Sequence, residues 1–163
     1  MPQFRKVLCP INFDENSLLA LGTASEIVRE QKSVLVLLHV VEIPGAPEVA
    51  LPFAKLEAAA RTQLQRFIAK VKMPVRTEIE VRMGDPGTEI ISAARKRTAD
   101  LIVMATHGRK GLRRLVLGSV AESVIRQAPC PVLTIRPHSL ATKPERSRLR
   151  KIESGLIDGS TSL

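Results

Sequence analysis

The sequence contains very few aromatic residues: no Trp, no Tyr and four Phe among 163 residues. Proteins that bind single-stranded nucleic acid stack bases on aromatic side chains, so this mode of binding is disfavoured. Cysteine is also scarce, since Cys9 and Cys130 are the two in the chain. Two thiols are too few for a disulfide framework or a four-cysteine zinc site. We expect both to be small, buried residues.

Long apolar runs are absent too, because no stretch approaches the roughly 18 residues that a membrane span requires. The N-terminal segment reaches Asp14 too early for the apolar core of a signal peptide. We therefore expect a cytoplasmic protein with no membrane partner. A length of 163 residues and a hydrophobic content of 44% are typical of one globular domain.

The charge of the chain is strongly one-sided: 25 Lys and Arg against 16 Asp and Glu give a net charge of +9. Such a balance favours anionic partners, which include nucleotides, nucleic acid and acidic protein surfaces. Nucleic acid is the unlikely member of this group, since charge alone supports it. The three histidines, His39, His107 and His138, do not have the spacing of metal ligands, and we expect His39 to be structural.

Apolar segments of two kinds alternate along the chain. The first kind is short and typical of strands, and the clearest example, Val34–Val41, is apolar throughout, as in strands buried on both faces. The second kind has helical spacing, as in Ala20, Ala24 and Ile27. The pattern predicts strands over Phe4–Ile11, Val34–Val41, Pro74–Arg82, Asp100–Ala105 and Pro131–Ile135, the third more exposed than the others, with a helix after each of the first four. It indicates an α/β fold with a parallel sheet, right-handed crossovers and helices on both faces.

Local signals mark where helices start and where the domain ends. Asp85 followed by Pro86 is typical of an N-cap and a first helical residue. Ser119 and Glu122 fit the capping box S-x-x-E. We expect one domain over residues 1–137, followed by a basic, flexible tail over residues 138–163.

The stretch Ala105–Ser119, ATHGRKGLRRLVLGS, combines glycines and cations without an acid. It leaves the C-terminal end of the fourth predicted strand, and open parallel sheets bind ligands at such ends, where the strand order reverses. Gly118 and Ser119 begin a helix whose free N–H groups favour an anion. Neither the P-loop pattern nor G-x-G-x-x-G is present. The alternative interpretation is a plain helix cap next to a solvated basic turn.

The chain resembles the universal stress protein family. The resemblance is carried by KVLCPINFDENSLLAL, VLLHVVE and DLIVMATHGRKGLRRLVLGSVAESVIRQAPCPVLTIRP, and it covers residues 3–137. It implies an open five-stranded sheet of order 3-2-1-4-5 (the adenine nucleotide alpha hydrolase-like fold), often dimerised along the fifth strand. It also implies a divided family. One branch binds ATP through G-2x-G-9x-G-[S/T], and another branch lacks the motif and does not.

Most of that motif is present in this sequence. Gly108 takes the second glycine position, and Gly118-Ser119 follows after nine residues, but Ala105 stands in the first glycine position. Asn12 stands where the family often has Asp, so it keeps a carbonyl acceptor for a ribose hydroxyl without the charge. The resemblance implies a site in which Pro10 and Val40 border the base, Met104 and Ala105 pack near the sugar, and Gly108, Ser119 and Val120 face the phosphates. The full set of implied nucleotide-binding residues is Pro10, Asn12, Val40, Met104, Ala105, Thr106, His107, Gly108, Arg109, Lys110, Gly111, Gly118, Ser119 and Val120.

The predicted function is a stress-response module that binds ATP or ADP, with Mg²⁺, at the switch point of the sheet. It signals as a homodimer paired through the fifth strand, with Val132, Leu133, Thr134 and Ile135 in the contact. We expect at most slow hydrolysis, because no Ser-His-Asp or Cys-His arrangement and no catalytic carboxylate can be inferred. The alternative is a protein-interaction module of the same fold that binds no nucleotide, which Ala105 and Asn12 favour.

Overall fold

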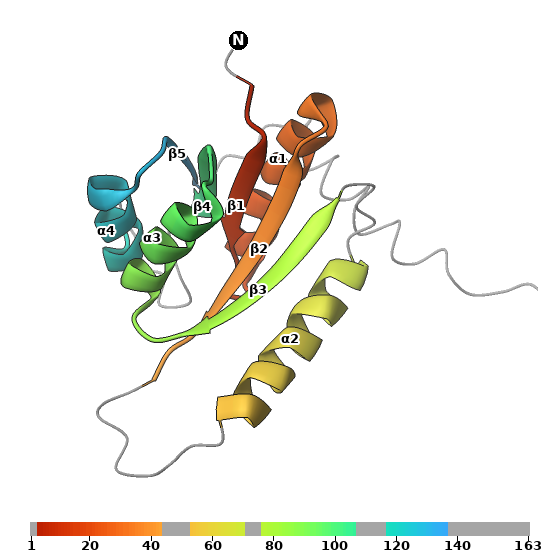
Figure 1. Cartoon of the computed structure of the whole chain (residues 1–163), viewed down its shortest axis with the longest axis vertical. Helices are drawn as coiled ribbons and strands as arrows, with labels where there is room; N and C mark the ends of the chain where they lie inside the picture. The colour runs from red at the N-terminus through yellow and green to blue at the C-terminus, as the bar shows by residue number, and fades with distance from the viewer. Residues whose placement is uncertain (1–2, 44–52, 71–75, 107–116, 137–163) are drawn as a thin grey trace, which may run out of the picture.

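The computed structural model describes residues 3–43, 53–70, 76–106 and 117–136, where strands and helices alternate (Figure 1). The elements are β1 (Lys6–Pro10), α1 (Glu15–Gln31), β2 (Val34–Val41), α2 (Phe53–Lys70), β3 (Thr77–Met83), α3 (Pro86–Arg97), β4 (Leu101–Ala105), α4 (Ser119–Gln127) and β5 (Val132–Ile135). The predicted alternation of strands and helices is confirmed. Among these described residues, no helix is both long enough and apolar enough to cross a membrane.

The five strands form one parallel sheet in the order β3-β2-β1-β4-β5, which confirms the expected fold. β1 is central, since Val7 pairs with Leu35 of β2 and with Leu101 of β4. β3 and β5 are the edge strands. Every residue of β3 is half-buried, which agrees with the prediction that this strand is more exposed than the others.

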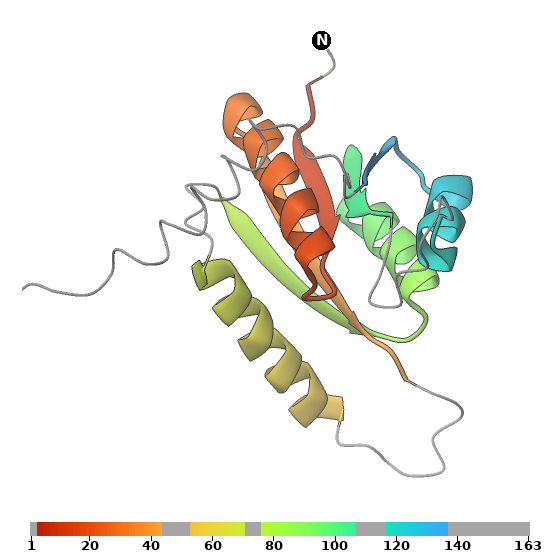
Figure 2. The same ribbon diagram turned by 180° about the vertical axis from the view of Figure 1, so that it is seen from behind.

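The sheet is covered on both faces because successive strand side chains point in opposite directions. Val7 and Cys9 of β1 pack with α1 and with Leu64 of α2. Leu8, between them, packs on the other face with residues of α3 and α4. Figures 1 and 2 view the molecule from opposite sides, with α3 and α4 nearer the viewer in Figure 1 and α1 in Figure 2. Two apolar cores therefore share one sheet.

Carboxylates cap the starts of α1 and α3. Asp14 accepts a hydrogen bond from the backbone N–H of Ser17 at 2.7 Å. Asp85 accepts one from the N–H of Thr88 at 2.8 Å, and Pro86 is the first helical residue, as predicted. The bonds from Thr88 hold the pKa of Asp85 below its usual value. Each carboxylate also lies at the positive end of a helix dipole, where an acidic side chain stabilises the helix.

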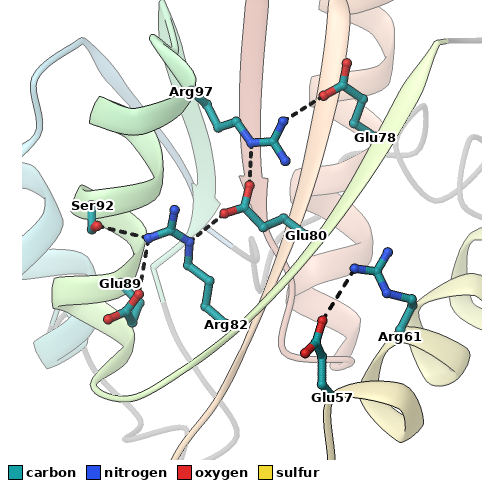
Figure 3. A network of polar contacts seen from close by, with 8 residues as sticks. All are labelled: Glu57, Arg61, Glu78, Glu80, Arg82, Glu89, Ser92 and Arg97. Carbon is teal, nitrogen blue, oxygen red and sulfur yellow. Dashed lines mark hydrogen bonds and ion pairs between the residues drawn. The ribbon is translucent and has the colours of Figure 1, made fainter. Parts of the chain in front are cut away.

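An ion-pair network covers the face of β3 that is turned toward α3 (Figure 3). Glu80 is shared by two guanidinium groups: Nε of Arg82 lies 2.6 Å from its Oε1, and Nε of Arg97 lies 2.5 Å from its Oε2. Arg82 continues to Glu89 at 3.2 Å, and Arg97 to Glu78 at 3.1 Å. The network joins the edge strand to the helix without a large apolar contact.

The carboxylate of Glu80 is the centre of this network, with a side chain only 12% exposed. Burial by itself raises the pKa of Glu80, but the hydrogen bonds from Arg82 and Arg97 outweigh it, and the pKa falls below its usual value of 4.5. Glu80 therefore stays charged in the folded protein well into the acidic range.

We predict that Glu80→Gln lowers the free energy of unfolding at pH 7 by about 1 to 3 kcal/mol, because two half-buried guanidinium groups lose their shared anion. The matched control is Glu57→Gln. It breaks an exposed pair with Arg61, at 3.7 Å and also drawn in Figure 3, and should cost less than about 1 kcal/mol. Urea unfolding of the three proteins measures both effects.

The cost of Glu80→Gln should also depend on pH. A carboxyl whose folded pKa is lowered contributes stability that is complete above its unfolded pKa, near 4.5, and is lost as pH falls through the folded value. The difference between wild type and Glu80→Gln should therefore narrow below about pH 4.5. A difference that stays constant down to about pH 3, where free carboxyl groups are protonated, would contradict the prediction.

Candidate functional site

The C-terminal ends of the strands lie along one edge of the sheet, because all five strands are parallel. At the centre of the sheet β1 lies between β2 and β4. The strands that follow β1 in the chain are first added on one side of it, as β2 and β3, and then on the other side, as β4 and β5. This is the switch point, where sheets of this kind bind ligands.

The fold brings the sequence-predicted residues to this edge from three strands. Pro10 ends β1, with Asn12 just beyond it. Val40 is near the end of β2, and Ala105 ends β4. The remaining described candidates are Met104, Thr106, Gly118, Ser119 and Val120. His107, Gly108, Arg109, Lys110 and Gly111 were predicted here too, but they lie outside the described residues.

Ala105 occupies the first glycine position of the motif, where a positive φ would have been a difficulty for alanine. The positive-φ residues of the described chain do not include it. Ala105 instead continues β4 and pairs with Ile135 of β5. Its backbone is therefore ordinary extended strand, so that the substitution adds one methyl group and no backbone strain.

The start of α4 is held against the end of β4 by a backbone contact. The N–H of Gly118 donates to the carbonyl of Thr106 at 3.0 Å. Gly118 has φ −62° and ψ 148°, which any residue can adopt. Glycine is needed for a different reason: a Cβ at this position would lie 3.0 Å from the same carbonyl oxygen of Thr106. The close approach of the two backbone segments therefore favours glycine, because any side chain here would push the carbonyl of Thr106 away by a few tenths of an ångström.

The predicted capping box at Ser119 is wrong. Gly118 is the N-cap of α4, and Ser119 is its first helical residue. Glu122 donates its N–H to the carbonyl of Gly118 at 2.9 Å, while its carboxylate pairs with Arg126 at 2.9 Å and does not reach back to the cap. Gly118 at the N-cap has no side chain that could cap the helix, and the contact with Thr106 favours glycine there.

As a result α4 differs from α1 and α3 at its N-terminus. Among the described residues, no side chain caps it. The first N–H groups of a helix have no acceptors within the helix, and they lie at the positive end of its dipole. The exposed Ser119 stands at this end. The arrangement suits a phosphate or another anion.

Asn12 belongs to a hydrogen-bonded cluster at the start of α1. Its Oδ1 accepts from the backbone N–H of Asp14 at 3.2 Å and from the hydroxyl of Ser17. Its Nδ2 donates to the carboxylate of Asp14 at 2.9 Å. The orientation of the amide follows, because the N–H of Asp14 can only donate and its carboxylate only accepts. The carbonyl expected to receive a ribose hydroxyl is thus already engaged, and Asn12 has one N–H left to offer.

Three aromatic rings, which the sequence did not predict to meet, lie beside this cluster. Phe13 has a left-handed backbone, with φ 63°, and its ring lies 4.3 Å from that of His39 and 5.6 Å from that of Phe67. Nδ1 of His39 lies 2.7 Å from the carbonyl oxygen of Ile11. His39 therefore supports the loop after β1, as its structural assignment predicted. Nothing in the local sequence signals a left-handed phenylalanine, since that backbone is rare outside glycine.

Neither cysteine is suited to nucleophilic chemistry. Burial raises the pKa of Cys9 to about 12, so its thiol stays protonated inside β1. Burial and the nearby charge of Asp100 also raise the pKa of Cys130, which is only half-buried. The prediction that both cysteines are buried is thus confirmed for Cys9, whereas Cys130 is only partly buried in the loop before β5.

The sequence of this chain is similar to those of one known protein family. The model of the universal stress protein family matches residues 3–136. A universal stress protein of Methanocaldococcus jannaschii is 35% identical over 142 residues, with 82% of each chain covered.

Two solved structures share the fold. Universal stress protein UspA from Lactobacillus plantarum has a TM-score of 0.69 at 27% identity, covering 83% of this chain and all of that one. The universal stress protein from Archaeoglobus fulgidus in complex with dAMP has a TM-score of 0.59 at 22% identity, covering 83% of this chain and 99% of that one.

The cluster around Asn12 generates a prediction. In Asn12→Asp the structure places the new carboxylate beside that of Asp14. We predict that Asn12→Asp lowers the free energy of unfolding at pH 7 by about 1 to 3 kcal/mol, since a donor is replaced by a like charge. The loss should shrink at about pH 3, where carboxylates are protonated.

The control for this variant exchanges the two residues. In Asn12→Asp/Asp14→Asn the amide and carboxylate change places, and Asn is as good an N-cap as Asp. Chemical unfolding of the two variants and wild type should show most of the lost stability recovered in the double variant. A double variant no more stable than Asn12→Asp would contradict the assigned hydrogen bonds.

Proposed function

Because the chain belongs to the universal stress protein family, we propose that it binds ATP or ADP at the switch point of its sheet. The observation that carries the proposal is the start of α4, which is fixed beside the end of β4 and has no side-chain cap among the described residues. The phosphates would take the acceptor role that capping carboxylates take in α1 and α3. The complex of a structural neighbour with dAMP supports an adenine nucleotide as the ligand.

The proposed contacts follow the order of the strands. Pro10 and Val40 border the base, and Met104 and Ala105 pack near the sugar. Asn12 offers the sugar a donor N–H, because its carbonyl is engaged by Asp14 and Ser17. The amides of Ser119 and Val120 face the phosphates, beside Thr106, which follows β4. Gly118, whose N–H is bonded to the carbonyl of Thr106, places the start of α4 next to them. His107, Gly108, Arg109, Lys110 and Gly111, outside the described residues, complete the proposed site.

Mg²⁺ would arrive bound to the phosphates. The carboxylate nearest to Asn12, that of Asp14, is already used to cap α1, so we assign no magnesium ligand to it. It is also poorly placed to activate water, because it accepts from Ser17 and from Asn12. We therefore propose at most slow hydrolysis, and signalling through the bound state.

The second part of the proposal is a homodimer. β5 is an edge strand of four residues, Val132–Ile135, and Leu133 is 38% exposed on it. An exposed edge with apolar residues invites pairing with another chain. A two-fold axis would pair β5 antiparallel with its own copy, which gives the same contacts on both subunits.

The backbone of β5 determines which residues can pair outward. The carbonyls of Pro131 and Ile135 accept hydrogen bonds from β4 and from Thr106. Because backbone groups alternate along a strand, Leu133 also directs its N–H toward β4. Val132 and Thr134 are then the residues whose backbone groups face the open edge.

The competing function is a protein-interaction module that binds no nucleotide. The engaged carbonyl of Asn12 favours it, since the expected acceptor for the sugar is not available. Such a module would use the same fold and the same β5 edge. Nucleotide binding itself is therefore the measurement that distinguishes the two.

We predict that Ser119→Asp removes most nucleotide binding without loss of stability. The new carboxylate would repel phosphate, yet an acid in the first turn of a helix is favourable for the helix. Calorimetry with magnesium and ATP should give a dissociation constant raised about tenfold or more, equivalent to about 1.4 kcal/mol. Ser119→Ala is the control and should bind nearly as wild type. If wild type binds no adenine nucleotide, the proposal fails.

Ser119→Asp is a cleaner test than Gly118→Val. A side chain at Gly118 would press on the carbonyl of Thr106 whether or not a ligand binds there. Loss of binding in Gly118→Val could therefore come from a displaced backbone as well as from a blocked phosphate site.

For the dimer, we predict that Thr134→Pro weakens association and leaves the fold intact. Proline removes an N–H that faces the open edge, where it is tolerated within a monomer. Leu133→Pro, in contrast, should disturb the sheet of the monomer, because the N–H of Leu133 is directed toward β4. Thr134→Val keeps the donor and should dimerise normally. Light scattering over a dilution series decides, and a dimer unaffected by Thr134→Pro would move the interface elsewhere.

A further inference from the structure

Thr106 is a buried residue that bonds to two separate segments. Its side chain and backbone are only 1% exposed. On one side its N–H donates to the carbonyl of Ile135 at 3.1 Å, and its hydroxyl lies 3.5 Å from the same oxygen. On the other side its carbonyl accepts from the N–H of Gly118 at 3.0 Å. One residue at the end of β4 thus holds both the end of β5 and the start of α4.

The two segments are those that carry the two parts of the proposed function. Ile135 is the last residue of β5, the proposed dimer edge. Gly118 is the N-cap of α4, where the phosphates are proposed to bind. β5 has only four residues, so a bond at its last carbonyl is a large share of what fixes its end.

The contact between Gly118 and Thr106 is tightly packed. A single methyl group at Gly118 would already lie 3.0 Å from the carbonyl oxygen of Thr106, closer than nine in ten real contacts of that type. A tightly packed arrangement transmits a displacement to its neighbours instead of absorbing it. A change at the start of α4 is therefore felt by Thr106, and through its N–H by Ile135.

We propose that nucleotide binding and pairing of β5 with a second copy strengthen each other through Thr106; this inference rests on the proposed function above. Phosphate bound to the first amides of α4 fixes Gly118 and with it the carbonyl of Thr106. The N–H and the hydroxyl of Thr106 then both hold the carbonyl of Ile135, so the end of β5 is ordered before a partner arrives. Less ordering cost remains for association, which gives positive coupling. The coupling is reciprocal, because linkage requires it.

The test measures the dimer dissociation constant with and without nucleotide. Sedimentation of the full chain over a dilution series gives this constant, and calorimetry confirms that magnesium and ATP are saturating. In wild type, saturating ATP should lower the dimer dissociation constant by roughly fivefold or more, the lower end of ordinary allosteric coupling.

The variants test Thr106 as the route. Gly118→Ala places a methyl group against its carbonyl, and the effect of ATP on the dimer should fall below about twofold, under the usual range of coupling. Gly22→Ala is the matched control, because no heavy atom lies within 4 Å of the added Cβ, and it should retain the wild-type effect. Each variant is compared at its own saturating ATP concentration, so weaker binding does not imitate lost coupling.

A second pair of variants covers the case in which Gly118→Ala does not fold. Thr106→Val removes the hydroxyl that faces Ile135, and Thr106→Ser keeps it. The effect of ATP on the dimer should be reduced in Thr106→Val and retained in Thr106→Ser. Thermal unfolding of both separates lost coupling from lost stability.

The outcomes distinguish this inference from the function on which it rests. Wild type that binds ATP and dimerises with equal constants in both conditions overturns the coupling and leaves the proposed function standing. Wild type that does not bind ATP, or does not dimerise, overturns both. Undiminished coupling in Gly118→Ala or in Thr106→Val overturns Thr106 as the route.

Discussion

One backbone contact, from the N–H of Gly118 to the carbonyl of Thr106, determines most of what this molecule can do at its switch point. A Cβ at position 118 would press on the carbonyl of Thr106, so the contact disfavours a capping side chain there. α4 must then begin with amides that other groups satisfy, which is the property that suits it to an anion. The same carbonyl belongs to the residue that holds the end of β5. The start of α4, the end of β4 and the end of the edge strand β5 are thus all held together at Thr106.

The position of β1 explains why these features gather at one edge. β1 lies between β2 and β4, and the helices that come next after β1 and β4, α1 and α4, pack on opposite faces of the sheet. The first turns of α1 and α4 differ in how their backbone N–H groups are satisfied. Asp14 caps α1, and its carboxylate accepts hydrogen bonds from Asn12 and Ser17, so its negative charge is used within the protein. Two helix starts at one edge thus have opposite characters, one already satisfied by a carboxylate and one open to a ligand.

Much of the fold could be predicted because its signals are local. The apolar run Val34–Val41 and the pair Asp85–Pro86 carry their structural meaning within a few residues. The errors concern contacts between distant segments. The capping box at Ser119 was wrong because the carbonyl of Thr106 occupies the space of a cap. The network around Glu80 was missed because Arg97 lies 17 residues along the chain from it. No sequence pattern reveals toward which neighbour a given N–H of β5 points.

The departures from the family pattern have physical reasons of their own. Ala105 continues a strand with ordinary φ, so the loss of glycine there leaves the backbone unchanged. Asn12 is explained by Asp14: a carboxylate at position 12 would face the carboxylate that caps α1, whereas an amide donates to it. The substitution therefore keeps the cap of α1 and reverses what position 12 presents to a ligand, from an acceptor to a donor. A sugar hydroxyl can meet either kind of group, because its oxygen accepts as well as donates. The change at Asn12 is then one of hydrogen-bond polarity within the proposed site, and it leaves the proposed phosphate contacts at α4 unchanged.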